Sequence, residues 1–385
     1  MLDETLLDAP EALALADHRG LLRGAAEAGA RVRTAARHAA EAGIAELRPD
    51  GRPRAVLVAG PGTAAAGVAD LVGALAGAAA PVIRLQPTGV AAAVGALRWA
   101  LPGWAGSVDL LLVPTTDGSE PGLALLVEQA YRRGITVVAV APKGSPLAES
   151  MGGSRGLFVP LAMGPHEAPD EYGESLAASP GALWALFTPL LALLDRVGLV
   201  EAPQEALEQV ADRLDRMAER CGPAIATYSN PAKTLAAELG NTLPLVWTEG
   251  EAAGPVGRRF AAVLAELGGL PALAAELPEA LPAHGMLLTG DYAANADPDD
   301  IFRDRVEEPE PALRARVVLL RDRPAEGNEF SAAPAARELA LGHDTAISEV
   351  EPEEGSALET LAELLAVTDF TAVYLSLASP GLPPE

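Results

Sequence analysis

The sequence predicts an α/β protein with two doubly wound, mainly parallel sheets that are joined by helices. Three observations predict this fold: short strands that are continuous apolar runs, helical segments that alternate with them, and a second half that repeats the order of the first. Strands that are buried on both faces have this continuous apolar character, as in a parallel sheet covered by helices. Strand–helix alternation at this spacing is typical of doubly wound folds.

The first half has the clearest strand–turn–helix pattern. The apolar run 55–59 leads through Gly60-Pro61-Gly62-Thr63 into a helix expected over 64–78. Further strands are expected at 81–85, 108–113, 136–140 and 156–159, with a helix over 120–133. Residues 1–50 are rich in Ala, which predicts an N-terminal helical segment. The first domain is therefore expected over 51–165.

A linker is expected over 166–221, where a loop rich in Pro, Gly and acidic residues precedes two helices at 182–197 and 204–220. The second domain, 222–385, is expected to have strands at 224–228, 244–247, 285–289 and 316–320 and helices over 232–239, 257–267 and 357–367. In this interpretation the strand at 285–289 corresponds to 110–113, and the strand at 316–320 corresponds to 136–140. Residues 322–334 and 351–355 are expected to be loops.

Composition excludes several classes of function. The 385 residues include 28 basic and 53 acidic ones, so the net charge is 28 − 53 = −25. Such a charge disfavours binding to nucleic acid or to anionic lipid, both of which need a basic surface. A single cysteine, Cys221, excludes an internal disulfide and a cysteine-based zinc site. The acidic N-terminus and the lack of an unbroken apolar run predict a cytoplasmic protein.

The order of these motifs resembles the double sugar-isomerase (SIS) architecture, and in particular the bifunctional phosphoglucose/phosphomannose isomerase family. The stretch 58–71 is similar to the Gly-rich turn and helix of that family. Thr115-Thr116-Asp117-Gly118-Ser119-Glu120 stands in the place of its phosphate loop. In the second half, Ala265-Glu266 stands at its Asn-Glu, Leu277-Pro278-Glu279 matches its Leu-Pro-Glu, and His284 falls near its His-Asn. The resemblance covers residues 50–378.

This resemblance implies an aldose–ketose isomerase that converts glucose 6-phosphate and mannose 6-phosphate to fructose 6-phosphate, with no cofactor and no metal. It also implies a homodimer whose active cleft lies between subunits. The reaction needs a base, a proton shuttle that opens the sugar ring, and a cation that stabilises the enediolate. By resemblance Glu266 is the base and His284 the ring-opening group. The residues implied in substrate binding are Gly60, Gly62, Thr63, Thr115, Thr116 and Ser119.

Several positions depart from the family pattern and weaken its anion site. Asp117 and Glu120 stand in the phosphate loop, where a carboxylate repels a phosphate by about 1 kcal/mol at about 4 Å in water. Their structural use would be to cap the helix that follows. The Arg of a family Pro-Arg pair is replaced by Gly181, and an expected Lys by Gly269. One alternative is therefore a catalytically degenerate relative that binds a sugar derivative or a protein partner.

Other groups of residues give weaker signals. Arg258 and Arg259 are the nearest cations to the implied base, but such a pair is expected to be exposed on a helix. The spacing Gly60-x-Gly62-x-x-Ala65 is similar to a dinucleotide fingerprint, so a nucleotide-binding oxidoreductase is the second alternative. The next strand ends without the acidic residue that would bind a ribose. The acidic clusters 297–300 and 307–310 are expected to be solvated loops.

Overall fold

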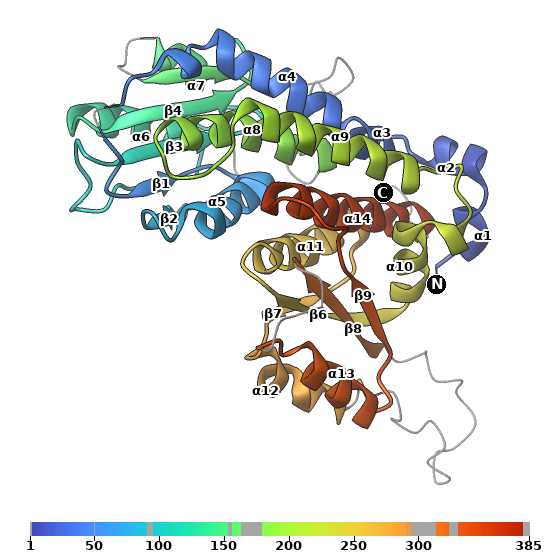
Figure 1. Ribbon diagram of the computed structural model, residues 1–385. Coiled ribbons are helices and arrows are strands. Elements are labelled where there is room, and N and C mark those ends of the chain that lie inside the picture. Colours follow the sequence, from blue (N-terminus) through green and yellow to red (C-terminus); the bar gives the residue numbers. More distant parts are fainter. Residues whose placement is uncertain are drawn as a thin grey trace. The chain divides into compact units, whose positions relative to one another are not determined.

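The computed structural model describes residues 2–49, 51–90, 95–152, 156–162, 179–290, 292–293, 313–322 and 330–379. The chain forms two compact units (Figure 1). We call residues 20–218 the first-sheet unit, and residues 1–19 together with 219–385 the second-sheet unit. The acidic clusters at 297–300 and 307–310 lie outside the described residues.

The first-sheet unit contains a five-stranded parallel sheet with the strand order β2-β1-β3-β4-β5. Its strands are β1 (Val56–Val58), β2 (Val82–Arg84), β3 (Leu110–Pro114), β4 (Thr136–Ala141) and β5 (Leu157–Pro160). Val56 is aligned with Val82 on one side and with Leu110 on the other. The direction in which the sheet is built therefore reverses between β1 and β3. Doubly wound sheets bind their ligands outside the carboxyl ends of the strands at such a point.

Helices cover both faces of this first sheet. The helices of this unit are α3 (Leu21–Ala26), α4 (Ala28–Glu41), α5 (Gly62–Ala76), α6 (Pro121–Arg132), α7 (Pro146–Met151), α8 (Pro180–Arg196) and α9 (Gln204–Arg220), with the 3-10 turn η1 (Ile44–Glu46). Buried side chains of α6 and α7, such as Leu126 and Leu147, pack on Leu111 and Val113. Helices α4, α5 and α8 pack together on the opposite face. The central strands β1, β3 and β4 are buried on both faces, as their apolar runs predict, whereas the outer strands β2 and β5 are half-buried.

The second-sheet unit contains a four-stranded parallel sheet with the order β7-β6-β8-β9. Its strands are β6 (Thr242–Glu249), β7 (Leu273–Glu276), β8 (Arg314–Arg321) and β9 (Ile347–Val350). Its helices are α1 (Glu4–Leu7), α2 (Pro10–Ala16), α10 (Pro231–Leu239), α11 (Ala253–Gly268), α12 (Ala280–Gly285), α13 (Ala333–Gly342) and α14 (Ala357–Ala378), with the 3-10 turns η3 (Thr227–Ser229) and η4 (Met286–Leu288). Helices α10, α11 and α14 lie on one face of the sheet, and α12 and α13 on the other (Figure 1).

Helix α14 is a single helix of 22 residues, although the sequence predicts that it ends near residue 367. Ser356 and Glu359 form a capping box at its start, which satisfies two backbone N–H groups reciprocally. By length and hydropathy α14 could cross a membrane, but its side chains are buried in the protein. It packs against α10 and α11 and is therefore a core helix.

Two strands expected in the second half are absent. Residues 224–228 form a turn and the start of η3, and the Lys233 ammonium donates to the carbonyls of Pro223 and Ile225 in this turn, at 2.8 Å each. Residues 285–289 belong to the end of α12 and to η4, where Leu288 packs in the core. A short apolar run cannot by itself distinguish a strand from a buried helical turn.

The correspondence between the two halves also differs from the prediction. By its place in the strand order, β6 corresponds to β1, and β8 corresponds to β3 rather than to β4. The strands β7 and β9 were not predicted. Strand β9 contains Ser348 and Glu349 and so has no continuous apolar run, and β7 is a four-residue edge strand that closely follows Pro271. The predicted doubly wound class is confirmed by the two parallel sheets with their covering helices.

Candidate functional site

At the carboxyl edge of the first sheet, the turns after β1 and β3 approach closely. A Cβ atom on Gly60 would lie 2.2 Å from the carbonyl oxygen of Pro114 and 2.7 Å from the Cβ of Ala65. Real Cβ atoms do not come this close to backbone atoms, so only glycine fits at position 60. The glycine thus brings the Gly60–Thr63 turn against the end of β3, at the point where the strand order reverses.

The N-terminus of α5 opens toward the same edge without an internal anion. Gly62, the first residue of α5, has a φ of +79°, a conformation that favours glycine. Pro61 occupies the N-cap position and makes no side-chain capping bond, and the first turn has no acidic residue. The positive end of a helix dipole with its backbone N–H groups is suited to bind a phosphate or carboxylate. Thr63 lies in this first turn and is half-buried.

The loop after β3 is held by its own side chains. Thr115 is fully buried, and its hydroxyl oxygen accepts a hydrogen bond from the backbone N–H of Gly118, at 3.0 Å. The backbone N–H and the hydroxyl of Ser119 donate to the Asp117 carboxylate, at 2.7 and 3.0 Å. Thr116 is half-buried and Ser119 is exposed. The Asp117 carboxylate therefore closes its own turn.

Neither acidic residue of this loop caps α6, contrary to the expectation from the sequence. Glu120 occupies the N-cap position of α6 but makes no capping bond there. Its Oε1 instead accepts a hydrogen bond from the backbone N–H of Gly95, at 3.2 Å. Asp117 is turned onto Ser119. The carboxylates stabilise neighbouring segments, and the start of α6, like that of α5, has no side-chain cap.

The loop between β4 and α7 is a third part of this edge, and the sequence analysis did not single it out. Its Ser145 is buried and caps α7 by accepting a hydrogen bond from Ala148 N–H, at 3.2 Å. The backbone N–H of Leu147 donates to the carbonyl of Gly118, at 3.1 Å. We call the three turns 60–63, 115–120 and 142–145 the first crevice, after the place outside the carboxyl ends of the strands where doubly wound sheets bind their ligands.

The equivalent edge of the second sheet already contains an anion of the chain itself. Asp322, directly after β8, is buried, and its Oδ2 accepts a hydrogen bond from Ala252 N–H at the N-cap of α11, at 2.9 Å. Gly250 allows this approach, because a Cβ atom there would lie 1.9 Å from the Asp322 Oδ1. The start of α11 is therefore occupied by a carboxylate.

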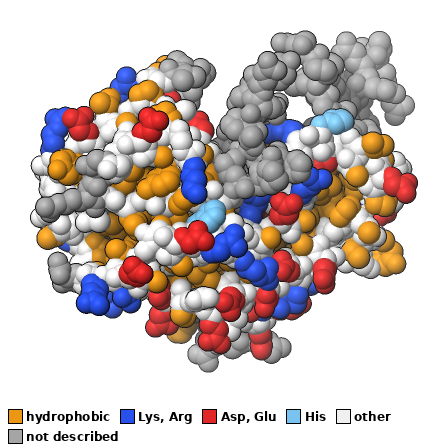
Figure 2. Space-filling view, turned by 90° about the horizontal axis from the view of Figure 1, so that it is seen from above, with side chains coloured by type: hydrophobic (Ala, Val, Ile, Leu, Met, Phe, Trp, Pro, Cys, Tyr) orange, Lys and Arg blue, Asp and Glu red, His pale blue; other side chains and the backbone are white. Residues whose placement is uncertain are grey.

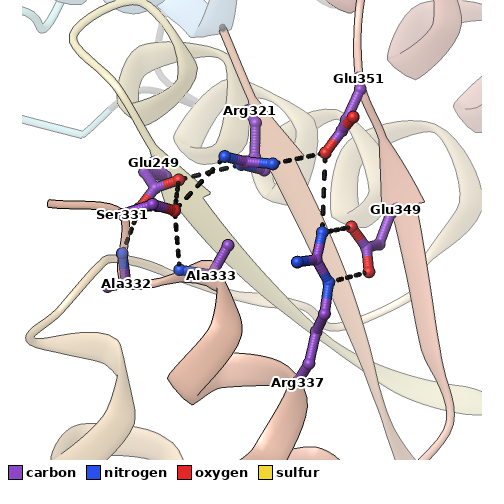
Figure 3. Close-up of polar contacts among 8 residues, drawn as sticks. All are labelled: Glu249, Arg321, Ser331, Ala332, Ala333, Arg337, Glu349 and Glu351. Atoms are coloured by element: carbon purple, nitrogen blue, oxygen red, sulfur yellow. Dashed lines mark hydrogen bonds and ion pairs between the residues drawn. The ribbon is translucent and has the colours of Figure 1, made fainter. Parts of the chain in front are cut away.

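A network of charged side chains fills the same edge of the second-sheet unit (Figure 3). The Arg321 side chain is 2% exposed, and it donates to Glu249 at 2.9 Å and to Glu351 at 2.5 Å. Glu249 also accepts from the backbone N–H of Ala332 at the N-cap of α13, at 2.6 Å. Burial alone would raise the pKa of Glu249, but its hydrogen bonds from Ser331, Ala332 and Arg321 outweigh burial and lower it.

The two residues implied in catalysis lie on helices that cover opposite faces of the second sheet (Figure 1). Glu266 is exposed in the last turn of α11. His284 is in α12 and 8% exposed, and its Nδ1 accepts a hydrogen bond from Trp247 Nε1, at 2.9 Å. The indole N–H is only a donor, so the His284 proton is assigned to Nε2. Burial lowers the pKa of His284, which favours the neutral imidazole at pH 7.

The two arginines near Glu266 have different environments. Arg258 is exposed and pairs with Glu276, as expected for a surface residue. Arg259 is buried and pairs with Asp369 of α14, so the prediction of an exposed pair is wrong for this residue. A charge inside a protein requires such a partner, since its desolvation is costly. Arg259 therefore anchors α11 to α14.

A separate cavity of about 750 Å³ lies in the first-sheet unit between α4, η1, α8 and α9. None of the residues implied by the resemblance lines it. Its charged lining residues include Arg33 and Asp212, which pair with each other at 2.6 Å.

Figure 2 shows acidic, basic and hydrophobic side chains interspersed on the face that it draws. Within the described ranges, no group of three His, Cys, Asp or Glu side chains is arranged to hold a metal ion.

Comparisons with known proteins agree with the fold. A protein from Silicibacter pomeroyi described as a candidate phosphosugar isomerase has a TM-score of 0.59 and 18% identity, covering 92% of this chain and 96% of that one. The C-terminal domain of glucosamine-fructose-6-phosphate aminotransferase from Francisella tularensis has a TM-score of 0.56 and 10% identity, covering 93% and 95%. These likenesses establish the fold.

Sequence comparisons point to one family. Residues 228–382 match the model of the bacterial phospho-glucose isomerase C-terminal SIS domain. The bifunctional phosphoglucose/phosphomannose isomerase of Caldicellulosiruptor bescii is 24% identical over 151 residues, which are 39% of this chain and 40% of that protein. The aligned part thus spans less than half of that relative. Residues 228–382 are thus similar to the SIS domain of bacterial phosphoglucose isomerases, and together with the weaker match to the bifunctional enzyme this supports a divergent relationship of the chain to the bacterial phosphoglucose/phosphomannose isomerase family.

Proposed function

We propose that this protein binds a phosphorylated sugar in the first crevice and isomerises it slowly or not at all. The observation that carries the proposal is the difference between the two sheet edges. In the second-sheet unit, Asp322 and Glu249 occupy the starts of α11 and α13. In the first-sheet unit, the carboxylates of the loop before α6 are bound elsewhere: Glu120 accepts from Gly95 N–H, and Asp117 accepts from Ser119. A phosphate is the ligand chemistry that such backbone N–H groups accept.

The residues of the first crevice suggest how each part contributes to binding. Gly60 and Gly62 bring the backbone close to the phosphate, and Thr63 and Thr116 supply hydroxyl groups at its rim. Thr115 is a positioning residue, since its hydroxyl is occupied by Gly118 N–H inside the loop. Ser119 offers its hydroxyl only if its bond to Asp117 is exchanged for one to the ligand.

The low isomerase activity that we propose follows from the environment of His284. Ring opening requires a group that gives and takes a proton at the sugar. The Nδ1 of His284 is engaged by Trp247, its pKa is lowered, and little of its surface reaches solvent. This imidazole is thus committed to the core of the second-sheet unit, which is a poor environment for exchanging protons with a substrate.

A second candidate function is the full isomerisation of glucose 6-phosphate and mannose 6-phosphate to fructose 6-phosphate. It is favoured by Glu266, whose carboxylate is exposed on α11 as a base that meets substrate must be. In this case the reaction takes place in a homodimer, with Glu266 moving a proton between C1 and C2.

The two candidates are separated by measuring binding and turnover on the same preparation. Calorimetric titration with the three sugar phosphates should give saturable binding, while a coupled assay for fructose 6-phosphate should give little turnover. Turnover that is abolished by Glu266→Gln with unchanged binding would establish the isomerase. Absence of binding by all three compounds would contradict the proposal, and tight binding of a dinucleotide would favour an oxidoreductase instead. Sedimentation of the same sample tests the proposed homodimer.

A further inference from the structure

The first crevice contains acidic residues but, in two of its three turns, no basic residue that could balance a bound anion. Its turns 60–63 and 115–120 contain two carboxylates, Asp117 and Glu120, and no basic residue. The Asp117 carboxylate is exposed, so its charge lies beside any anion that binds there. A phosphate monoester carries about −1.5 to −2 charges at pH 7. A cation is therefore required nearby if the site is to bind such a ligand well.

The third turn of the first crevice supplies this cation. Lys143 lies two positions after the end of β4 and is exposed. It is one of only two lysines in the chain, and the other, Lys233, is fully buried in the second-sheet unit. Among the described residues, no hydrogen-bond or ion-pair partner of the Lys143 side chain is found. It is the only basic residue in the three turns.

Backbone contacts hold this turn against the loop after β3. The register pairs Pro114 with Val140, and Thr115 N–H donates to the carbonyl of Val140, at 2.9 Å. On the other side of Lys143, Leu147 N–H donates to the carbonyl of Gly118, at 3.1 Å. Neighbouring strands are about 4.8 Å apart. A lysine stem reaches about 6 Å, so the ammonium group can extend over the adjacent loop.

The local conformation of the turn favours this role. Gly144 has a φ of +78°, which redirects the chain directly after Lys143. Ser145 then caps α7 and is buried beside Gly118, where a Cβ atom would lie 2.8 Å from that of Ser145. The backbone on both sides of Lys143 is thus fixed, while its side chain is exposed.

We propose that Lys143 is the phosphate-binding cation of the first crevice and replaces the Arg and Lys that the family pattern would supply elsewhere. This inference rests on the proposed function and adds a residue to it. The ligand class is a phosphate monoester whose phosphate lies between the start of α5 and the loop after β3, with the Lys143 ammonium over it.

The test is a calorimetric titration of the full chain with glucose 6-phosphate and with inorganic phosphate. Lys143→Met keeps the length of the stem and removes the charge. It should lower the affinity for both ligands at least tenfold, because a charge-assisted hydrogen bond is lost. Lys143→Arg should restore most of the affinity. The matched control is Arg132→Met on α6, an exposed cation of the same unit that pairs with Glu128, and it should leave both affinities unchanged. Thermal unfolding of each variant checks that it is folded.

The outcomes distinguish this inference from the proposed function. Equal affinity of wild type and Lys143→Met for glucose 6-phosphate would overturn the role of Lys143 and leave the proposed function standing. If the wild type binds inorganic phosphate but no sugar phosphate, the proposed function fails, and the effect of Lys143→Met on phosphate still decides the inference. Binding of neither ligand by the wild type would overturn both.

Discussion

At the scale of single residues, side chains of catalytic type are found in structural roles. His284 accepts the indole N–H of Trp247, and the one buried lysine, Lys233, binds two carbonyl groups and lies 5.5 Å from the ring centroid of Tyr374. Burial is also the main reason why the pKa of the Cys221 thiol is raised to about 12. The residue type alone would not have revealed these environments, because each depends on partners that are distant in sequence.

Replacement of His284 should show its structural role. His284→Leu leaves the Trp247 N–H buried without an acceptor, so we expect a loss of about 1–3 kcal/mol in the free energy of unfolding. Urea denaturation followed by tryptophan fluorescence measures it. His18→Leu, at an exposed position, should change stability by less than about 0.5 kcal/mol. Equal stability of the two variants would contradict this interpretation.

The same residue should make stability depend on pH. The pKa of His284 is lower in the folded protein than the 6.5 of an unperturbed histidine. The unfolded chain therefore binds the proton first, and stability should fall as pH decreases from about 6.5 through the lowered folded pKa. In His284→Leu this part of the pH profile should be flatter. A profile with the same slope in both proteins would exclude His284 as its cause.

Gly60 gives the clearest test of the geometry of the first crevice. Gly60→Ala places a Cβ atom against the Pro114 carbonyl, so the turn must shift, and both stability and sugar-phosphate affinity should decrease. Gly73→Ala is a matched control in α5, where a Cβ atom meets nothing within 4 Å. That change should stabilise the protein by about 0.5–1 kcal/mol. Unaltered ligand affinity in Gly60→Ala would argue against the proposed site.

At the scale of elements, the two sheets end in different chemistry although they share one topology. The starts of α11 and α13 receive carboxylates from Asp322 and Glu249, whereas Asp117 and Glu120, the carboxylates of the loop before α6, bind Ser119 and Gly95 instead. Because the caps come from distant segments, short-range capping patterns in the sequence do not reveal them. The pairing of Ser356 with Glu359 at α14 is the contrasting case, since all its parts lie within one turn.

Removal of one of these caps should weaken the second-sheet unit. Asp322→Asn loses a charge at the N-cap of α11. We therefore expect the free energy of unfolding, measured by chemical denaturation, to fall by about 0.5–2 kcal/mol. Asp344→Asn is the matched control, because Asp344 has a φ of +51°, which asparagine also tolerates. If both variants unfold at the same urea concentration, the carboxylate of Asp322 does not stabilise α11.

The sequence predicts the strands of the first sheet because they form mainly apolar runs, and the central strands β1, β3 and β4 are buried on both faces. It predicts less of the second sheet, where β7 and β9 are half-exposed and a three-residue helical turn at 286–288 resembles a strand. For the site, the sequence indicates the turns after β1 and β3. It does not reveal that Arg259 is buried or that Lys143 adjoins the loop after β3, since both depend on packing between segments.

At the scale of the whole molecule, the difference between the sheet edges predicts the binding stoichiometry. Each chain should bind one sugar phosphate, because the second edge is filled by Asp322, Glu249 and Arg321. Calorimetry of purified protein gives this ratio directly. Two equivalent sites per chain would contradict the inference that the internal carboxylates exclude a ligand.

The second-sheet unit is assembled from both ends of the chain, and this affects how it can form during synthesis. Asp3 N–H donates to the carbonyl of Ala378, at 2.8 Å, and Asp8 accepts from Thr227 N–H, at 2.8 Å. Residues 20–218 are continuous and can acquire their structure while the ribosome is still translating the remainder. Residues 2–19 are translated before the first-sheet unit, yet their partners are translated after it. A premature stop codon near residue 370 should therefore leave both the N-terminal helices and the second sheet exposed to chaperones and proteases, while sparing the crevice at 60–145.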